Sequence, residues 1–228
     1  LSVSNDRAEK MVRLPWSNSL LVCGIANSYW ALANYRLPDL KPVNSFGVNG
    51  ISSYNYTNQY EDKTPEIAID SALQKIYLAG RTDDKGFIIL RLNKDGSIDT
   101  TFGKKGVVSY FVSIYYGGLA VLPDHKIVIG GVVQSGSSGY SMIARFNVNG
   151  TVDSLFGTDG EVRNLPMTPN SIITDMYKNR MLIGGPAPLP FFEQAVSAMA
   201  IKYNGVIDSS FGVNGLAVKK SILGSAAV

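Results

Sequence analysis

The sequence predicts an all-β fold, a β-propeller built from four repeats of about 55 residues with four antiparallel strands in each repeat. The first observation behind this prediction is a Phe-Gly-x-x-Gly motif that occurs four times, at spacings of 56, 54 and 55 residues. The second is an apolar run ending in glycine upstream of each motif, and the third is a turn sequence between the two. The motif phenylalanines are Phe46, Phe102, Phe156 and Phe211.

These spacings place the repeats at about 1–50, 51–106, 107–160 and 161–215, with 216–228 as an extra strand or a closing segment. We expect one domain over 1–228, because all-β domains of this length are common. In the third repeat the predicted strands are a short one at 118–122, the apolar run at 126–131 and a strand that contains Arg145. The fourth follows the motif, as at 107–111 after the second copy.

The turn before each motif is typical of a β-hairpin. Asp95-Gly96 and Asn149-Gly150 supply residues that tolerate the positive φ angles of a type I′ turn. The fourth repeat shortens this turn and the first replaces it with residues 37–40, so the two end repeats diverge most.

The apolar runs are too short for helices and suit strands that are covered on both faces by stacked blades. They lie at 20–24, 75–80, 126–131 and 180–185. The loops that follow them vary in length from repeat to repeat, at 26–28, 81–86, 133–139 and 186–194. Loops at one equivalent position lie on one rim of a propeller, so we expect a binding surface there.

Composition excludes several classes of function. Hydrophobic residues make up 45% and charged residues 17%, as in a globular protein. The net charge is +3 and no basic run is interleaved with aromatic residues, which argues against nucleic-acid binding. No apolar stretch approaches the roughly 18 to 20 residues that span a bilayer. The single cysteine, Cys23, excludes an internal disulfide and is expected to be a packed strand residue.

The repeated residues resemble the delta-60 repeat, a tandem-repeat family of bacterial proteins. Lys75 or Lys126 opens the apolar strand, Arg91 or Arg145 lies in the next strand, and Asp99 or Asp153 stands three residues before the phenylalanine. The fourth repeat keeps Asp208 but has Lys202 at the arginine position, and the first has Arg36 but Val43 at the aspartate position. The resemblance implies a propeller-like β array, often in exported or surface-attached proteins, and no assigned activity.

The location follows only from that resemblance and from the sequence start. The chain begins at Leu1, which fits a trimmed chain or a mature protein that has lost a signal peptide. We therefore expect an extracytoplasmic protein, whether periplasmic, surface-attached or secreted.

The repeated charges have two interpretations. Asn93 to Asp99 has alternating oxygen donors and a central glycine, as a calcium loop does, but it lacks the late bidentate glutamate. A structural hairpin is favoured, in which Asp99, Asp153 and Asp208 accept backbone hydrogen bonds or pair with Arg91, Arg145 and Lys202. We therefore predict no metal site and no cofactor.

No catalytic motif is present in the sequence. The only histidine, His125, lies in a turn without a second histidine or a cysteine near it in the pattern, and no nucleophile elbow or phosphate loop occurs. The sequence thus predicts that the protein is not an enzyme.

Clustered tyrosines are the candidate binding residues: Tyr54, Tyr56, Tyr60, Tyr115 and Tyr116. Exposed tyrosines beside asparagine and serine suit recognition of a carbohydrate or a protein, although strands also favour tyrosine for packing alone.

We therefore expect a non-enzymatic binding or scaffold protein that presents its rim loops to a protein or glycan partner. The alternative is a polysaccharide hydrolase or lyase with a site in the propeller channel, which would require carboxylates or a histidine to converge there.

Ring closure stays open at this point. Residues 1–3 and 216–218 both occupy the position of the strand that follows the motif, so one strand is supernumerary in a ring of four blades. The ring closes within the chain, or it includes more sequence or another subunit, and an unpaired terminal strand provides a route to an oligomer.

Overall fold

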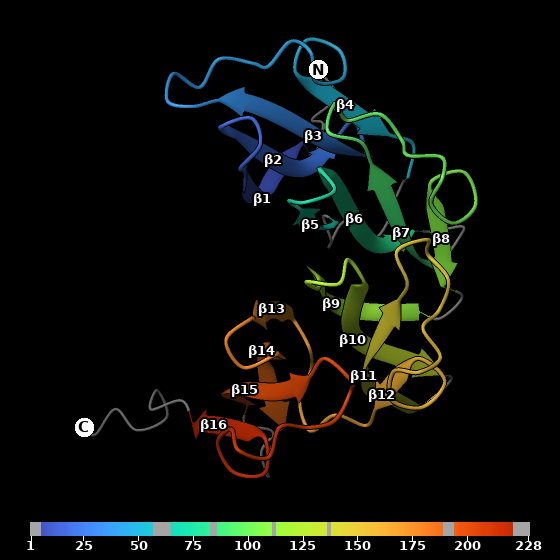
Figure 1. The fold of residues 1–228 in the computed structure, drawn as a ribbon, viewed down its shortest axis with the longest axis vertical. Coiled ribbons are helices and arrows are strands. Elements are labelled where there is room, and N and C mark those ends of the chain that lie inside the picture. The colour runs from blue at the N-terminus through green and yellow to red at the C-terminus, as the bar shows by residue number, and fades with distance from the viewer. Residues whose placement is uncertain are drawn as a thin grey trace. The chain divides into compact units, whose positions relative to one another are not determined.

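The structure, a computed structural model, describes residues 6–56, 65–82, 86–110, 113–135, 138–188 and 194–220. All regular elements in these segments are β-strands, sixteen in number, which form four sheets of four strands each (Figure 1). This confirms the predicted all-β fold with four propeller blades. No helix in the described part of the chain is long and apolar enough to cross a membrane.

Each sheet is one blade, and its strands follow one another along the chain. Blade 1 contains β1 (Arg7–Leu14), β2 (Ser19–Ala26), β3 (Tyr29–Arg36) and β4 (Ile51–Tyr54). Blade 2 contains β5 (Glu66–Asp70), β6 (Lys75–Thr82), β7 (Gly86–Leu92) and β8 (Val107–Tyr110). Blade 3 contains β9 (Ser113–Val121), β10 (Ile127–Ser135), β11 (Ser138–Phe146) and β12 (Glu161–Arg163). Blade 4 contains β13 (Ser171–Asp175), β14 (Arg180–Pro188), β15 (Gln194–Lys202) and β16 (Leu216–Lys220).

The strand after each Phe-Gly-x-x-Gly motif completes the blade that precedes it, so the blades end one strand later than the predicted repeat boundaries at residues 50, 106, 160 and 215. β4, β8 and β12 do so in the first three blades, and β16 pairs with β15 from Met199↔Leu216 to Ala195↔Lys220. Residues 216–218 are therefore an ordinary blade strand. Residues 1–3, which were predicted to occupy the same strand position, lie outside the described residues.

The chain divides into two compact units, which are described separately. The first comprises 1–113 with 148–151 and includes blades 1 and 2, and the second comprises 114–147 with 152–228 and includes blades 3 and 4. The turn of the third repeat, Val148–Thr151, thus belongs to the first unit. One domain over 1–228 stays a prediction.

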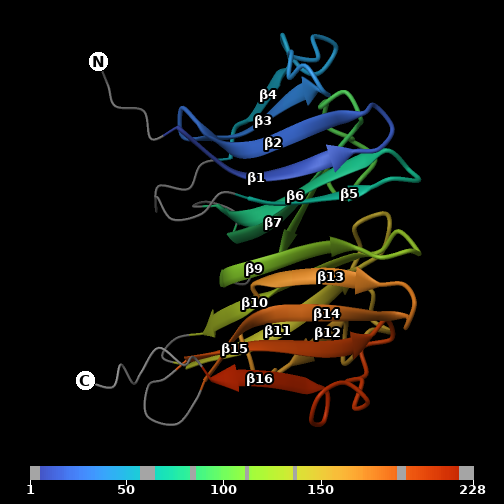
Figure 2. The same cartoon turned by 90° about the vertical axis from the view of Figure 1, so that its left-hand side faces the viewer.

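The core of the first unit lies between the facing sheets of blades 1 and 2. Leu21, Cys23, Trp30 and Leu32 alternate along β2 and β3 and are fully buried, which follows from the two-residue period of a strand. They pack against the facing side of the blade 2 sheet, where Ile76, Leu78, Ile88 and Leu90 alternate in the same way along β6 and β7. β1 lies beside β5 at one margin of this interface (Figure 2).

The second unit has an equivalent core between blades 3 and 4. Val128 and Ile143 of blade 3 contribute to it, and blade 4 supplies four fully or almost fully buried side chains. These four are Met181, Ile183, Met199 and Ile201. Methionine adapts its shape easily, which suits a packing surface shared between two sheets.

The Phe-Gly-x-x-Gly motif is a tight turn anchored by its phenylalanine. In the second repeat Phe102 is fully buried, and its carbonyl accepts a hydrogen bond from the backbone N–H of Gly106 at 2.8 Å. Gly103 and Gly106 have φ angles of 50° and 93°, which glycine adopts without the steric cost of a side chain. The N–H of Gly103 donates to the carbonyl of Asn149 at 2.9 Å, so the motif also holds the turn of the next repeat.

Candidate functional site

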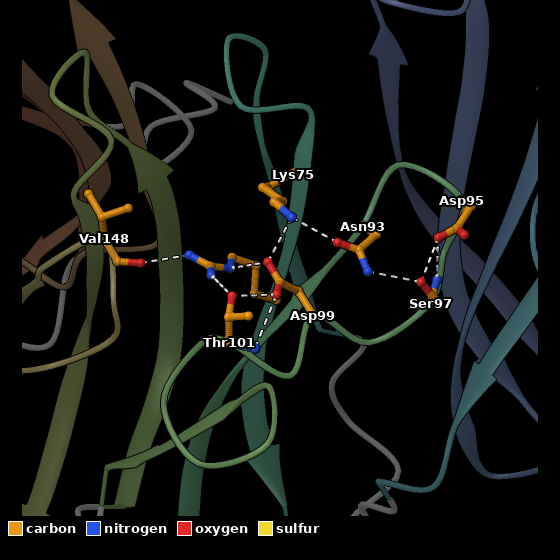
Figure 3. A network of polar contacts seen from close by, with 8 residues as sticks. Lys75, Asn93, Asp95, Ser97, Asp99, Thr101 and Val148 are labelled. Carbon is orange, nitrogen blue, oxygen red and sulfur yellow. Dashed lines mark hydrogen bonds and ion pairs between the residues drawn. The ribbon is translucent and has the colours of Figure 1, made fainter.

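The repeated charges form a buried cluster around Asp99 in the first unit (Figure 3). Lys75 Nζ lies 2.8 Å from the carboxylate of Asp99, and Arg91 Nε lies 2.9 Å from it. The backbone N–H and Oγ1 of Thr101 donate to Asp99 at 3.1 and 2.6 Å. Arg91 also donates to the carbonyl of Val148 at 2.6 Å, so this cluster fastens the turn of the next repeat.

The surroundings of Asp99 stabilise its ionised form. Burial by itself raises the pKa of this carboxyl, but hydrogen bonds from Lys75 and Thr101 and the charge of Arg91 outweigh it and lower the pKa well below 3.8. The guanidinium of Arg91 also stacks on Phe102, 4.7 Å from the ring centroid. These contacts are all made within the protein, so the cluster acts as an architectural element.

Asp153 has the same role in the second unit. Lys126 Nζ lies 2.8 Å from its carboxylate and Arg145 NH2 lies 2.7 Å from it. Arg145 donates in turn to the carbonyl of Tyr203 in the turn of the next repeat and stacks on Phe156. The predicted pairing of Asp99 with Arg91 and of Asp153 with Arg145 is therefore confirmed by the geometry.

The fourth repeat corrects the predicted partner of Asp208. Arg180, not Lys202, binds this carboxylate, with NH1 2.8 Å away, and the side chain of Lys202 is exposed. Arg180 stands at the strand-opening position that Lys75 and Lys126 occupy in their repeats, so the two basic positions have exchanged roles. Hydrogen bonds from Ser210 and Arg180 lower the pKa of Asp208 to about 2.

The first repeat lacks this cluster because Val43 replaces the aspartate and packs against the core of the first unit. Its arginine, Arg36, pairs instead with Asp39 three residues later, at 2.5 Å, in an exposed position. The divergence that the sequence predicted for this end repeat thus includes its ion pairs.

The segment from Asn93 to Asp99 forms the predicted hairpin turn. Asp95 accepts hydrogen bonds from the backbone N–H and Oγ of Ser97, and Asn93 accepts one from Lys75 at 2.7 Å. These oxygens are therefore occupied within the turn, as Figure 3 shows. Over the described residues, no group of three or more His, Cys, Asp and Glu side chains is arranged to hold a metal ion.

A second charged cluster lies where β1 meets β5 in the first unit, and it is not repeated. Lys10 of β1 donates to the carboxylate of Glu66, the first residue of β5, and the side chains are 32% and 24% exposed. On the same strand as Lys10, Arg7 Nε lies 2.6 Å from the carboxylate of Glu9. Two carboxylates and two cations thus share a half-buried margin between blades 1 and 2.

The pKa of Glu66 shifts in the direction opposite to that of Asp99. Burial raises it and is the largest effect, a hydrogen bond and the positive charge of Lys10 counteract it, and the negative charge of Glu9 raises it further. The net pKa lies above the ordinary value of 4.5. A carboxyl that keeps its proton at higher pH than usual is suited to donating that proton.

Cys23 lies beneath this cluster. Its Sγ is 3.7 Å from the carbonyl oxygen of Pro65, and burial raises the pKa of the thiol to about 12. The thiol is therefore protonated and unreactive, as expected for a packed strand residue.

Sequence reasoning missed Glu66 and Glu9 because it searched for residues that recur. Lys10, Glu66 and Ser171 occupy one equivalent register position, since they pair with Cys23, Ala79 and Gly184 in the glycine-ended strands. This position changes from cation to anion to hydroxyl between repeats. A charge that breaks the repeat at an otherwise regular position was the available indication.

The predicted binding tyrosines are placed differently from one another. Tyr54 is buried and its hydroxyl donates to the carbonyl of Gly96 at 2.7 Å, while Tyr56 packs against Trp30 with ring centroids 5.6 Å apart. Tyr60 lies outside the described residues, and for Tyr115 and Tyr116 the structure describes only the backbone of β9. A binding role for these residues stays a prediction.

The predicted rim loops are only partly described. The connection between β2 and β3 is a turn through Asn27 and Ser28, both with positive φ. The equivalent loops after β6, β10 and β14 contain residues outside the described ones. His125 lies in the turn between β9 and β10, as predicted, with a φ of 65°.

Two stretches of the chain, residues 75–102 and 122–156, match the family model described as a domain of unknown function (DUF5122) β-propeller. They fall in the second and third repeats, the two that keep the complete Lys, Arg and Asp pattern. The match supports a β-propeller repeat family, and the delta-60 name stays a prediction. No curated protein matches the chain.

Solved structures with a similar fold include an endo-1,4-β-xylanase from Bacteroides thetaiotaomicron VPI-5482, with 9% identity, a TM-score of 0.49, and coverage of 97% of this chain and 73% of the xylanase. An α-L-arabinofuranosidase from Clostridium thermocellum ATCC 27405 has 10% identity and a TM-score of 0.40 over 88% of this chain and 71% of its own. Oligopeptidase B from Leishmania major has 11% identity and a TM-score of 0.48, over 95% of this chain and 34% of its own.

These structures correct the prediction that the protein is not an enzyme. That prediction rested on the absence of a catalytic motif, yet the similar folds include those of a xylanase and an arabinofuranosidase. A non-enzymatic function therefore does not follow from this fold. At this similarity the structures assign no activity to the chain either, so any activity has to be argued from its own residues.

Proposed function

We propose that the protein hydrolyses a glycosidic bond of a polysaccharide at the margin between blades 1 and 2, with Glu66 as the proton donor. The observation that carries this proposal is a carboxyl of raised pKa held beside a second carboxylate, in a half-buried position. Glycoside hydrolysis needs such a pair, because one group protonates the leaving oxygen while the other acts as a carboxylate.

The two glutamates differ in the way this chemistry requires. Glu66 is half-buried and its pKa is raised, so its protonated form persists to higher pH than that of an ordinary glutamate. Glu9 forms an ion pair with Arg7, whose Nε lies 2.6 Å from its carboxylate. In this proposal Glu66 gives its proton to the glycosidic oxygen, and Glu9 stabilises positive charge on the sugar or activates water.

Lys10 sets the balance within the site. Its hydrogen bond to Glu66 opposes the effect of burial, which keeps the carboxyl able to release as well as to hold a proton. β1 and β5 supply these groups from adjacent blades, so the packing of the first unit fixes their separation. A binding surface on the rim loops and an extracytoplasmic location stay predictions, and both would suit a polysaccharide substrate.

The test is the release of reducing sugar ends from xylan, arabinan, cellulose and chitin by the wild-type chain and by Glu66→Gln. We expect hydrolysis of one of these polymers and a loss of about 100-fold or more in Glu66→Gln, the usual contribution of a positioned general acid. Glu9→Gln should also be impaired. The matched control is Glu161→Gln, because Glu161 is a buried, ion-paired glutamate in the second unit.

Full activity in Glu66→Gln, or no release from any of the four polymers, would contradict the proposal. Release of an unsaturated sugar, detected by its ultraviolet absorbance, would indicate a lyase instead of a hydrolase.

A further inference from the structure

Asn-Gly pairs occur in four turns of the chain, and they differ in their hydrogen bonds although their sequences are identical. In each pair the asparagine is exposed, and the glycine is buried with a positive φ of 89° or 91°. The pairs are Asn49-Gly50, Asn149-Gly150, Asn204-Gly205 and Asn214-Gly215. An asparagine side chain cyclises readily onto the nitrogen of a following glycine, because glycine has no Cβ to block the approach. The local hydrogen bonds therefore distinguish the reactivity of the four pairs.

The attacking group in this reaction is the glycine nitrogen, and in three of the pairs its N–H is already hydrogen-bonded. It donates to a backbone carbonyl within its own turn at 2.9 or 3.0 Å. The accepting carbonyls are those of Phe46, Lys202 and Phe211. The N–H of Gly150 has no such acceptor among the described residues. Because a hydrogen bond has to break before the nitrogen can lose its proton and attack, Gly150 is the least hindered of the four.

The group that is attacked, the side-chain amide of Asn149, is held and polarised by Thr151. Its Oδ1 accepts hydrogen bonds from the backbone N–H of Thr151 at 3.0 Å and from Oγ1 at 2.8 Å. Since Thr151 follows Gly150 directly, these bonds fold the amide back over the Gly150 nitrogen. Two donors also stabilise the negative charge that develops on a carbonyl oxygen when its carbon is attacked. Asn204 receives one printed donor instead, the N–H of Val206 at 3.1 Å, because valine has no hydroxyl.

We propose that Asn149 is a site of spontaneous deamidation, the fastest of the four pairs, and that its conversion to isoaspartate loosens the turn that contains it. The nitrogen of Gly150 forms a bond to Cγ of Asn149, the bond between Cγ and Nδ2 breaks, and ammonia leaves with the proton that Gly150 gives up. Water then opens the succinimide ring. Opening at Cγ gives aspartate, and opening at the main-chain carbonyl carbon gives isoaspartate.

The turn that contains Asn149 makes two hydrogen bonds to the second repeat within the first unit. The carbonyl of Asn149 accepts one from the N–H of Gly103 at 2.9 Å. The carbonyl of Val148 accepts one from NH1 of Arg91 at 2.6 Å (Figure 3). Both bonds require the backbone of this turn to keep its length and direction.

Isoaspartate changes that backbone. The main chain then runs through Cβ and Cγ of the former Asn149, so the turn is longer by a methylene group. The space around the turn is already filled, since a Cβ added to Gly150 would lie 2.5 Å from Cγ2 of Val108. We therefore expect the product to lose its fit against the second repeat. This effect is independent of the proposed hydrolase activity, whose residues lie between β1 and β5.

The experiment is incubation of the folded chain at mildly alkaline pH, with peptide mass spectrometry to follow aspartate and isoaspartate at each of the four pairs. We expect Asn149 to react at least about fivefold faster than the other three, because one hydrogen bond is worth roughly that factor in rate. In the chain unfolded by urea the four rates should converge. A difference that persists in urea, or an Asn149 that is no faster than the others in the folded chain, would overturn the proposal.

Two reciprocal variants test the role of the hydroxyl. Thr151→Val removes a donor and should slow Asn149 about fivefold, whereas Val206→Thr adds the equivalent donor and should accelerate Asn204 by a similar factor. Asn49 and Asn214 are the internal controls, and their rates should not change in either variant. Unchanged rates at Asn149 and Asn204 would refute the part assigned to the hydroxyl.

The loosening of the turn has its own readout. Urea denaturation of the incubated wild type should show a lower midpoint as isoaspartate accumulates. Asn149→Ser is the control, because serine can accept the hydrogen bond from the N–H of Thr151 but cannot cyclise. Its midpoint should stay constant during the same incubation. An unchanged midpoint in wild type that contains isoaspartate at residue 149 would overturn the proposed loosening.

Discussion

The first unit holds a buried carboxylate, Asp99, and a half-buried one, Glu66, that each contact a lysine, yet their pKa values move in opposite directions. Asp99 is contacted by Lys75 and Arg91 and accepts hydrogen bonds from Thr101, and its pKa falls well below 3.8. Glu66 accepts a hydrogen bond from Lys10, which is the one group that lowers its pKa, and the negative charge of Glu9 lies nearby. Its pKa rises above 4.5. The number of donors decides the sign, because a single ion pair does not offset the cost of burying a carboxylate.

The difference also separates architecture from chemistry. The Asp99 cluster recurs around Asp153 and, with the two basic positions exchanged, around Asp208. In the Asp99 and Asp153 clusters the arginine also donates a hydrogen bond to a backbone carbonyl in the turn of the next repeat. The Glu66 cluster occurs at one margin only, and its charges break the repeat. Charges that recur with the fold serve the fold, and charges that depart from it are the better candidates for function.

The largest effect is expected from Asp99→Asn. The change removes the negative charge that faces the half-buried Lys75 and the buried Arg91. Leaving these cations without a counter-charge should lower the free energy of unfolding by about 3 kcal/mol. Urea denaturation followed by fluorescence would measure it. Asp95→Asn is the control, because Asp95 lies in the exposed turn and asparagine can accept the same hydrogen bonds from Ser97. Equal stabilities of the two variants would show that the Asp99 cluster is not a structural element.

A smaller loss of stability is expected from Arg180→Lys in the fourth repeat. Arg180 contacts Asp208 and Asp175 at 2.8 and 3.0 Å and stacks on Phe211, and a lysine cannot make these three contacts together. Lys202→Met should have no measurable effect, since the structure gives that lysine no part in the cluster. A larger loss from Lys202→Met than from Arg180→Lys would restore the pairing predicted from the sequence.

The pH dependence of stability should have opposite signs at the two carboxyls. The raised pKa of Glu66 means that the folded state binds its proton more readily, so stability falls as pH rises above 4.5 toward the folded pKa. The lowered pKa of Asp99 means that its contribution is complete above 3.8 and is lost as pH falls toward the folded pKa. Urea midpoints of the wild type, Glu66→Gln and Asp99→Asn across acidic pH would show both.

In Glu66→Gln the fall in stability above pH 4.5 should disappear, and in Asp99→Asn the difference from the wild type should shrink below pH 3.8. The same slope in both variants would mean that the two sites do not differ.

The fold was predictable because its determinants recur. The spacing of Phe46, Phe102, Phe156 and Phe211 gave the number of blades, and Asp-Gly or Asn-Gly gave the hairpin turns. The partner of Asp208 was not predictable, because Arg180 and Lys202 pair directly across β14 and β15. The sequence does not show which of these two side chains binds the carboxylate. Glu66 was not predictable as a site residue, since its raised pKa depends on burial against Lys10 of another blade, 56 positions away.

The finest test of the comparison is the removal of each lysine. In Lys10→Met, Glu66 loses the one group that lowers its pKa, so its pKa should rise further and it should stay protonated to higher pH. In Lys75→Met, Asp99 keeps Arg91 and Thr101, so its pKa should rise but remain below 3.8. Carbon-detected NMR titration of the side-chain carboxyls would measure both, with Glu66→Gln to assign the signal. A pKa of Glu66 that falls in Lys10→Met would mean that burial does not govern this site, and the case for Glu66 as a proton donor would fall with it.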